Sequence, residues 1–278
     1  MDTHYHTPSW MSGLLVMLGI AIALLPKDRS RGALEVASAL NDAFIMIVRG
    51  IMRCAPIGVF CLIVPIVATL GIKVLMSLGA YCLTVILGLA LIQFVLYPTV
   101  VVVFSRMPLR HFFRGIAQVQ MVAFSSSSSA ATLPVTIQAV RDKLGVPQDI
   151  TSFVCALGAK INMDGTALMQ AVATVFLAQF YGTELTLVAQ GSIVFTAVVS
   201  AIGTPGIPSG GMVMLVIVLR SVGVPAEGIA MILAVDRVLD MCRTVVNVTG
   251  DAAVAVAVAG TEGALPKQFG HPSEPPAR

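Results

Sequence analysis

The stretch AFSSSSSAATLP, residues 123–134, places five consecutive serines in the middle of a chain that is otherwise strongly apolar. Hydrophobic residues make up 57% of the 278 residues and charged residues only 11%, whereas soluble domains carry roughly 25% charged residues. The mean hydropathy is +0.92. This composition predicts a polytopic, all-α membrane protein, and the small net charge of +3 indicates no nucleic-acid partner.

Seven apolar runs follow one another, roughly at 11–25, 43–70, 75–104, 115–140, 150–180, 186–221 and 228–260. The connections between them differ in charge. Those at 27–31, 106–114 and 141–143 are basic, whereas those at 71–74, 181–186 and 222–227 carry little charge. Because short cytoplasmic loops are enriched in Lys and Arg, we expect the basic connections inside and the other three outside.

The run that contains the serines is too short to cross the membrane twice. Segment 115–140 begins and ends at basic connections, so it must cross an even number of times. Two full crossings need about 40 residues, but the segment has 26 and the serines interrupt it. We therefore predict a re-entrant helical hairpin with its tip at the serines. By the same argument, segment 186–221, broken by GTPGIPSGG (203–211), forms a second re-entrant hairpin that enters from the opposite face.

Each predicted hairpin is followed by a span with a polar interruption. NMDGT (162–166) lies in span 150–180, and DRVLDMCRTVVNVTGD (236–251) lies in span 228–260. We predict that both spans are broken transmembrane helices. A hairpin followed by a broken span, repeated from the opposite face, is typical of inverted-repeat transporters, whose binding sites lie near the membrane midplane.

Ionisable residues in these apolar surroundings need a partner or a ligand. Asp236, Asp240, Arg243, Asn247 and Asp251 follow one another at helical spacing and form one polar stripe. Arg243 is a forked donor suited to a carboxylate, and Asp240, one turn away, suits an ammonium group. The pair favours an amino acid with an acidic side chain. The alternative is an internal salt-bridge network that only joins helices.

Two further features suit ligands. The serine tip offers hydroxyl groups and helix N-terminal N–H groups to a second carboxylate. Asp164 and Asp251, with nearby backbone carbonyls, offer hard oxygen ligands to a small cation.

Four stretches, SSSSSAATLPVT, INMDGTAL, IGTPGIPSGG and DMCRTVVNVTGDA, resemble in sequence and order the signature motifs of the glutamate/aspartate transporter family, the dicarboxylate/amino acid:cation symporters. The resemblance covers roughly residues 12–260. It implies sodium-coupled symport of an acidic amino acid by an elevator-type movement, in a homotrimer in the cell (inner) membrane. A C4-dicarboxylate symporter of the same family is the alternative.

The resemblance also implies site residues. For the substrate they are Ser127, Ser128, Ser129, Thr166, Ile207, Gly211, Asp240, Arg243, Thr244 and Asn247. For a first sodium ion they are Asp251 with the carbonyls of Gly158, Asn162 and Asn247. For a second they are the carbonyls of Ala201, Ile202 and Thr204, with Met163 and the backbone of Lys160, and for a third Asp164 with the Asn162 side chain. Gln170 stands where the proton- and potassium-coupled animal members have a glutamate, which implies that this coupling is absent.

The family has eight spans and two hairpins, and this determines the expected domains. Residues 1–70 are expected to form part of a scaffold, the end of a fourth span and a fifth span. Residues 71–260 are expected to form the transport domain, and 261–278 a disordered cytoplasmic tail. Because three spans and most of a fourth are then absent, a truncated, inactive fragment is a further alternative.

Lys160 departs from the family pattern, which usually has a small polar residue there. Its ammonium group either replaces the second sodium ion as a tethered cation, or only its backbone matters and the side chain lies along a wet crevice. An enzyme is not expected. An intramembrane serine protease would need a base near the serines, and the four histidines, His4, His6, His111 and His271, lie outside the apolar runs.

Overall fold

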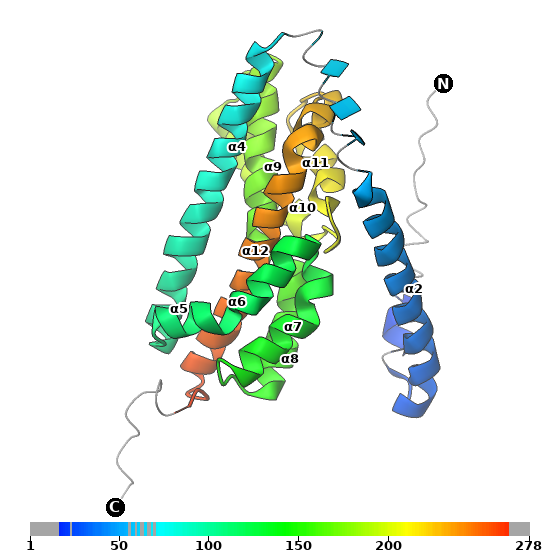
Figure 1. The fold of residues 1–278 in the computed structure, drawn as a ribbon, viewed down its shortest axis with the longest axis vertical. Coiled ribbons are helices and arrows are strands. Elements are labelled where there is room, and N and C mark those ends of the chain that lie inside the picture. The colour runs from blue at the N-terminus through cyan, green and yellow to red at the C-terminus, as the bar shows by residue number, and fades with distance from the viewer. Residues whose placement is uncertain are drawn as a thin grey trace, which may run out of the picture. The chain divides into compact units, whose positions relative to one another are not determined.

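The structure, a computed structural model, describes residues 17–22, 24–54, 57–58, 60–61, 64–65, 68 and 71–266. Within these ranges the chain forms helices joined by turns, with no strand, so the all-α prediction is confirmed (Figure 1). The chain divides into two compact units, Met1–Cys54 and Ala55–Arg278. The predicted disorder of residues 267–278 lies outside the described residues.

The first unit contains one long helix, α2 (Lys27–Arg53). Pro26 precedes it, and the Pro26 carbonyl accepts hydrogen bonds from the N–H groups of Arg29 and Ser30, at 2.9 and 3.0 Å. Large apolar side chains along the helix are exposed, among them Leu34, Val36, Leu40, Met46 and Ile47. Such an apolar surface is typical of a helix that contacts lipid or another part of a protein. Its assignment to a scaffold stays a prediction.

The second unit begins with a long rod made of three helical pieces. These are α4 (Lys73–Leu91), a π-helical turn η1 (Ile92–Leu96) and α5 (Tyr97–Ser105). Pro98 explains the π turn, because proline has no N–H to donate and its ring displaces the carbonyl four residues earlier. The N–H of Tyr97 accordingly donates to the Ile92 carbonyl, five residues back.

Two helical hairpins form where the sequence predicts them. The first pairs α6 (Leu109–Ser126) with α7 (Ser129–Asp142) around a tip at Ser127 and Ser128. The second pairs α10 (Leu187–Ile202) with α11 (Gly210–Ser221) around residues 203–209. The first hairpin begins six residues before the predicted start at residue 115, because Pro108 marks the helix start. Insertion of the hairpins from opposite membrane faces stays a prediction.

The first predicted broken span is interrupted as expected. Helix α8 (Gln148–Ile161) ends before Asn162 and Met163, whose backbones are not helical, and α9 (Asp164–Phe180) follows. Such a break leaves N–H groups at the start of α9 without helical partners. The N–H of Gly165 is satisfied from outside, because it donates to Oδ1 of Asn247 at 2.9 Å.

The prediction of a break in the second span is wrong. After a short 3₁₀ turn η2 (Ala226–Gly228), α12 runs unbroken from Ile229 to Thr261, over 33 residues. This helix contains no proline, and its polar side chains bond to neighbouring elements while its backbone stays helical. The polar stripe therefore interrupts the run of apolar residues in this span, but the backbone stays helical throughout.

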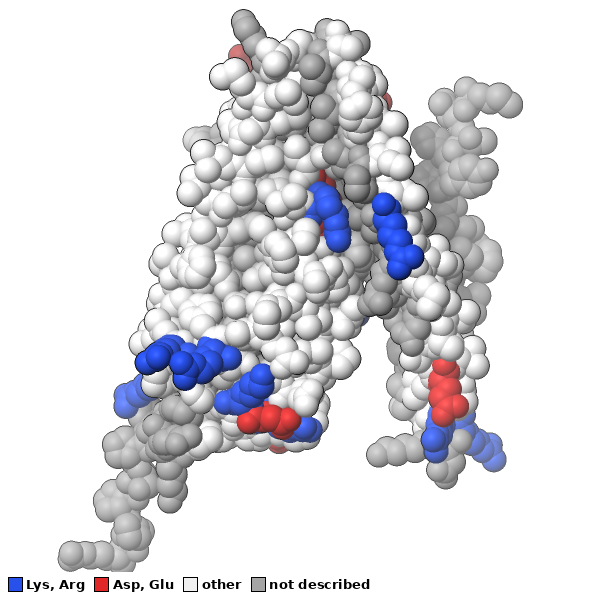
Figure 2. All heavy atoms as spheres, viewed as in Figure 1, with Lys and Arg blue, Asp and Glu red and all other residues white. Residues whose placement is uncertain are grey.

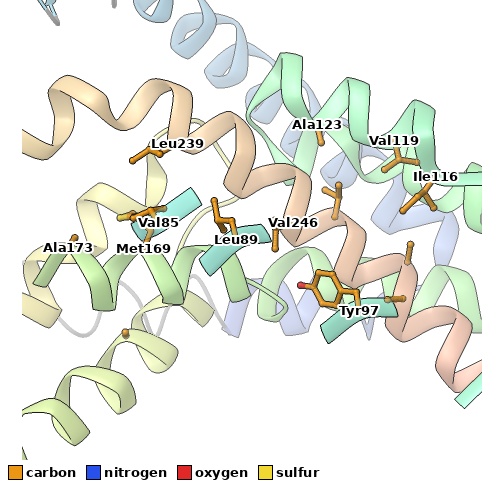
Figure 3. Packing of buried hydrophobic residues seen from close by; sticks show 14 of the residues in the cluster. Val85, Leu89, Tyr97, Ile116, Val119, Ala123, Met169, Ala173, Leu239 and Val246 are labelled. Carbon is orange, nitrogen blue, oxygen red and sulfur yellow. The ribbon is translucent and has the colours of Figure 1, made fainter. Parts of the chain in front are cut away.

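Helix α12 is the central element of the second unit. It packs against α4, α5, α6, α7, α8, α9 and α11 (Figure 1). Figure 3 shows buried residues of α4, α6 and α9, such as Leu89, Ile116 and Met169, arranged around Leu239 and Val246 of α12. The C-terminal half of α12, rich in Ala and Gly, allows this close approach because small side chains let helix backbones come together.

The first residues of the predicted tail are ordered. Helix α12 ends at Thr261, the N–H of Ala264 donates to the Ala259 carbonyl at 2.9 Å, and Leu265 is buried in the core. The expected disorder from residue 261 is therefore wrong for 261–266, because Leu265 gains apolar contacts there.

Two helical stretches of the described chain are long and apolar enough to cross a membrane, Val74–Ser105 with 32 residues and Gln148–Phe180 with 33. Helices α10 and α11 are apolar but shorter. Their lengths suit hairpin arms better than full crossings, which need about 20 residues.

Gly250 of α12 tests the close packing around this helix. A Cβ atom there would overlap the side chains of Asn162 and Tyr97. We expect Gly250→Ala to destabilise the protein by about 1–3 kcal/mol, because overpacking forces neighbouring groups to move. The measurement is the thermal unfolding temperature of the purified protein in detergent.

The matched control is Gly191→Ala in α10, where nothing lies within 4 Å of the added Cβ. This variant is expected to unfold no earlier than the unchanged protein. Equal unfolding temperatures for both variants would contradict the packing described around Gly250.

Candidate functional site

Four buried residues form a closed ring of hydrogen bonds between the second hairpin tip and α12. Arg243 donates through Nη1 to Oδ1 of Asp236 at 3.2 Å and through Nη2 to Oδ1 of Asp240. Ser209 donates through Oγ to Oδ2 of Asp236 and through its backbone N–H to Oδ2 of Asp240, both at 2.9 Å. Each carboxylate thus binds both Arg243 and Ser209. We call these residues, Ser209, Asp236, Asp240 and Arg243, the four-residue ring.

The sequence explains the ring locally. Asp236, Asp240 and Arg243 lie on one face of α12 because they are spaced by four and three residues. Ser209 precedes α11 with a left-handed backbone, φ +56°, and its side chain accepts no hydrogen bond from that helix. This conformation turns its N–H and its hydroxyl group toward the two carboxylates.

With both carboxyl groups ionised, the ring carries one more negative than positive charge in a buried place. Arg243, Asp236 and Asp240 are at most 3% exposed. Burying charges costs several kcal/mol for each ion unless they are paired and hydrogen-bonded. All four carboxylate oxygens accept a hydrogen bond, so the structure meets this requirement. The excess carboxylate makes the site suited to a ligand that brings a cationic group.

The tips of the two hairpins touch beside the ring. Ser128 donates through Oγ to the Gly206 carbonyl at 2.6 Å, and the N–H of Ala130 donates to the same carbonyl at 3.3 Å. Ser128 also caps α7, because its Oγ accepts from the N–H of Ala131 at 3.1 Å. The serine stretch therefore forms a helix cap and a contact with the opposite hairpin.

Asn247 and Asn162 join α12 to the break between α8 and α9. Asn247 accepts from the Gly165 N–H through Oδ1 and donates through Nδ2 to Oγ1 of Thr166 at 3.2 Å. Asn162 donates through Nδ2 to Oδ1 of Asp251 at 3.1 Å and to the Asn247 carbonyl at 3.3 Å. The polar backbone of the break is thereby held against the polar stripe of α12.

Nine of the ten predicted substrate residues line one small cavity between the tips, α9 and α12. They are Ser127, Ser129, Thr166, Ile207, Gly211, Asp240, Arg243, Thr244 and Asn247. The tenth, Ser128, contacts Gly206, which also lines the cavity. The cavity volume is about 10 Å³, which is about the minimum for one water molecule. An amino acid enters this site only if the tips move apart.

The predicted sodium residues fall into two places. Gly158, Asn162, Asn247 and Asp251 gather at the break, where a Cβ on Gly158 would come within 2.5 Å of Oδ1 of Asp251. Met163 and Thr204 line the cavity, and Ala201 and Ile202 form the last turn of α10.

The two residues predicted for a third sodium ion bond to different neighbours. Asp164 accepts a hydrogen bond from the Tyr97 hydroxyl at 3.0 Å, and the Asn162 side chain donates to Asp251. Lys160, in the last turn of α8, is exposed.

Sequence reasoning missed several contacts of the site. In the sequence, Ser209 lies in the Gly-Pro tip, Tyr97 in an apolar run and Arg237 in the polar interruption of the last span. Arg237 donates through Nη1 to Oγ of Ser127 at 2.8 Å, and Gln170 donates through Nε2 to the Gly211 carbonyl at 3.0 Å. Ser209, Tyr97, Arg237 and Gln170 each stand out in the sequence as a polar residue inside an apolar segment. Their spacing does not show which partner each one bonds to.

Comparisons of the whole sequence with known proteins identify related proteins. The family model described as the sodium:dicarboxylate symporter family matches residues 14–261. Excitatory amino acid transporter 3 of Mus musculus is 41% identical over 243 residues, which are 86% of this chain and 46% of the relative. Excitatory amino acid transporter 2 of Homo sapiens is 38% identical over 241 residues, 86% of this chain and 42% of the relative. The chain thus spans less than half the length of the curated relatives it matches.

The four-residue ring predicts a large effect of removing its one cation. Arg243→Met leaves two buried carboxylates without a counter-charge, so we expect a loss of about 3–5 kcal/mol of stability. The triple variant Arg243→Met with Asp236→Asn and Asp240→Asn carries no charge there and is expected to regain much of that loss. The measurement is the thermal unfolding temperature in detergent.

The control is Arg141→Met. Arg141 donates to Oδ1 of Asp142 at 2.6 Å, and this hydrogen bond lowers the pKa of Asp142, but both side chains are 45% exposed. Exposed ion pairs contribute little, so the unfolding temperature should stay nearly unchanged. An Arg243→Met protein as stable as this control would refute the ring as a stabilising unit.

Proposed function

The chain belongs to the sodium:dicarboxylate symporter family, and from this membership we propose that it carries the substrate and sodium sites of a secondary active transporter for an acidic amino acid. The names of its relatives, excitatory amino acid transporters from several mammals, support this substrate class. Covalent chemistry is not part of the proposal. The function is the coupled movement of an amino acid and sodium across a membrane.

The observation that carries the proposal is the buried pairing of Arg243 with two carboxylates beside the serine tip. An acidic amino acid has one ammonium group and two carboxylates. We assign the ammonium to Asp240, the side-chain carboxylate to Arg243 and Thr166, and the main-chain carboxylate to Asn247 and Ser129. A C4-dicarboxylate has no ammonium group and would leave the excess carboxylate charge of the ring unmatched, so we favour an amino acid.

Binding requires the second hairpin tip to move. A cavity of about 10 Å³ is too small for an amino acid. Ser209 also donates its N–H to Asp240 and its hydroxyl group to Asp236, where a ligand would otherwise bind. We propose that this tip, with Ile207 and Gly211, is a lid that leaves the ring when substrate enters and closes over it afterwards. Elevator-type movement of the 71–260 transport domain, within a homotrimer, is the family mechanism that we propose for the complete protein.

Sodium is proposed as the coupled ion, transported with the substrate. Unwound backbone in discontinuous helices supplies carbonyl ligands for sodium in transporters. The Asn162 carbonyl lies in the α8–α9 break and the Gly158 carbonyl in the last turn of α8, and both residues are close to the Asp251 carboxylate. Oxygen donors of this kind suit a hard cation, which supports a first sodium site at these residues.

The charge distribution supports an orientation in the cell (inner) membrane. Figure 2 shows Lys and Arg side chains at the end of the larger unit that holds the α5–α6 and α7–α8 connections. The exposed basic residues of these connections and helix ends are Arg106, Arg110, Arg114, Arg141 and Lys143. Since Lys and Arg are enriched on the cytoplasmic side, we propose that this end, and with it the C-terminal tail, faces the cytoplasm.

The test is calorimetric binding of L-aspartate to the purified protein, first in sodium and then with choline in its place. We expect binding only in sodium, and we expect Arg243→Cys to abolish it, because the side-chain carboxylate then loses its forked donor. Succinate is the control ligand for the dicarboxylate alternative. Unchanged aspartate affinity in Arg243→Cys would refute the role of Arg243, and a folded protein that binds neither ligand would favour an inactive fragment.

The role of Lys160 has its own measurement. The exposure of its side chain supports the interpretation that only its backbone takes part in the second sodium site. We therefore expect Lys160→Thr to keep the number of sodium ions transported with each substrate, measured from reversal potentials in liposomes. One additional coupled sodium ion in the variant would instead support the tethered cation.

A further inference from the structure

Two adjacent charged residues of α12 reach opposite hairpin tips. Asp236 accepts a hydrogen bond from Oγ of Ser209 in the second tip. Arg237 donates through Nη1 to Oγ of Ser127 in the first tip, at 2.8 Å. Both serines have left-handed backbones, with φ of +51° for Ser127 and +56° for Ser209. Each left-handed tip residue is thus held by one charged side chain of α12.

The conformation of Ser127 determines how the first tip presents its serines. A left-handed backbone is unfavourable for a residue other than glycine and persists where its surroundings hold it. Ser127 directly follows the last residue of α6. The chain then turns through Ser128, whose backbone is extended with φ −140°, into α7, which starts at Ser129. A change at Ser127 would therefore redirect both the Ser128 contact with Gly206 and the Ser129 side chain that lines the cavity.

The contact of Arg237 is with this hydroxyl group and not with the neighbouring acid. Both oxygens of Asp236 already accept hydrogen bonds from Arg243 and Ser209. Arg237 is half-buried, whereas Ser127 is 2% exposed. A hydrogen bond from a charged donor is roughly twice as strong as one between neutral groups, and it is stronger in a poorly solvated place.

We propose that Arg237 is a positioning residue for substrate binding: it holds Ser127 in its left-handed conformation and thereby aims Ser128 and Ser129 at the cavity. This inference rests on the proposed function for its substrate. Its structural part, the coupling of Arg237 through the Ser127 hydroxyl group to the conformation of the first tip, is independent of which substrate binds.

The experiment is a double-mutant cycle between Arg237→Ala and Ser127→Gly in the full protein, reconstituted in liposomes. Glycine adopts the left-handed conformation without help, so it removes the need for Arg237. We expect Arg237→Ala alone to raise KM for L-aspartate roughly tenfold with little change in maximal uptake. In the Ser127→Gly background the same substitution should change KM by less than about twofold. Arg237→Lys, which can still donate, should show a smaller increase than Arg237→Ala.

Arg220→Ala is the matched control. Arg220 is an exposed cation in the last turn of α11, at the end of the second hairpin arm, and is not part of the first tip. It should leave KM unchanged. A tenfold effect of Arg237→Ala that persists in Ser127→Gly and is screened by salt would show attraction of an anionic substrate and overturn the proposal. If Ser127→Gly alone abolishes uptake, the cycle is decided on the thermal unfolding temperature, where equal effects of Arg237→Ala in both backgrounds would overturn the proposal.

Failure of the proposed function is distinguishable from failure of this inference. If the unchanged protein transports no acidic amino acid, the same cycle is measured on the thermal unfolding temperature in detergent. Arg237→Ala should then lower the unfolding temperature in the unchanged background and not in Ser127→Gly. Equal shifts in both backgrounds would show that the two residues are not coupled and would refute the inference without reference to substrate.

Discussion

The structure of the larger unit depends on one electrostatic constraint, which is that the guanidinium group of Arg243 is buried and must be matched. Two carboxylates of the same helix match it, and one of them is in excess of what charge neutrality needs. The second hairpin tip completes the arrangement, because Ser209 supplies the two remaining donors. A buried charge cluster of this kind is stable only when all its members are in place. The position of the tip is therefore linked to the charges of the site, and in the proposed function a ligand that carries its own charges replaces the tip.

A second constraint acts on the backbone. Helix ends and breaks expose N–H and carbonyl groups that need partners wherever water is scarce. At the α8–α9 break these partners come from α12, through Asn247 and Asp251, and at the first tip they come from the serines themselves. The same polar groups that satisfy the break are the ones proposed to bind sodium and substrate. The side chains of the proposed site therefore also hold the irregular backbone in place.

The continuous α12 helix allows the same polar groups to serve both the fold and the proposed site. A continuous helix of 33 residues, roughly 50 Å long, presents Asp236 and Arg237 to the two tips, Asp240 and Arg243 to the cavity, and Asn247 and Asp251 to the break. A broken helix in its place would give each of these groups an independent orientation. Because α12 is packed on many sides and its small residues admit close neighbours, it acts as a rigid reference for the more irregular elements around it.

The sequence predicted the helical class, the helix pairs α6–α7 and α10–α11, the break at Asn162 and Met163, and nine of the residues that line the cavity. These follow from composition, from the length of apolar runs, and from motifs that resemble a known family. The sequence failed at α12, because a polar stripe interrupts hydropathy in the same way whether the backbone breaks or not. The fold in space was needed to show that Arg243 pairs with both Asp236 and Asp240, that Ser209 closes the ring, and that Arg237 reaches Ser127 across 110 residues of chain. The physical reason is that hydrogen-bond partners are chosen by proximity in space, which helical spacing specifies within one helix and leaves open between separate ones.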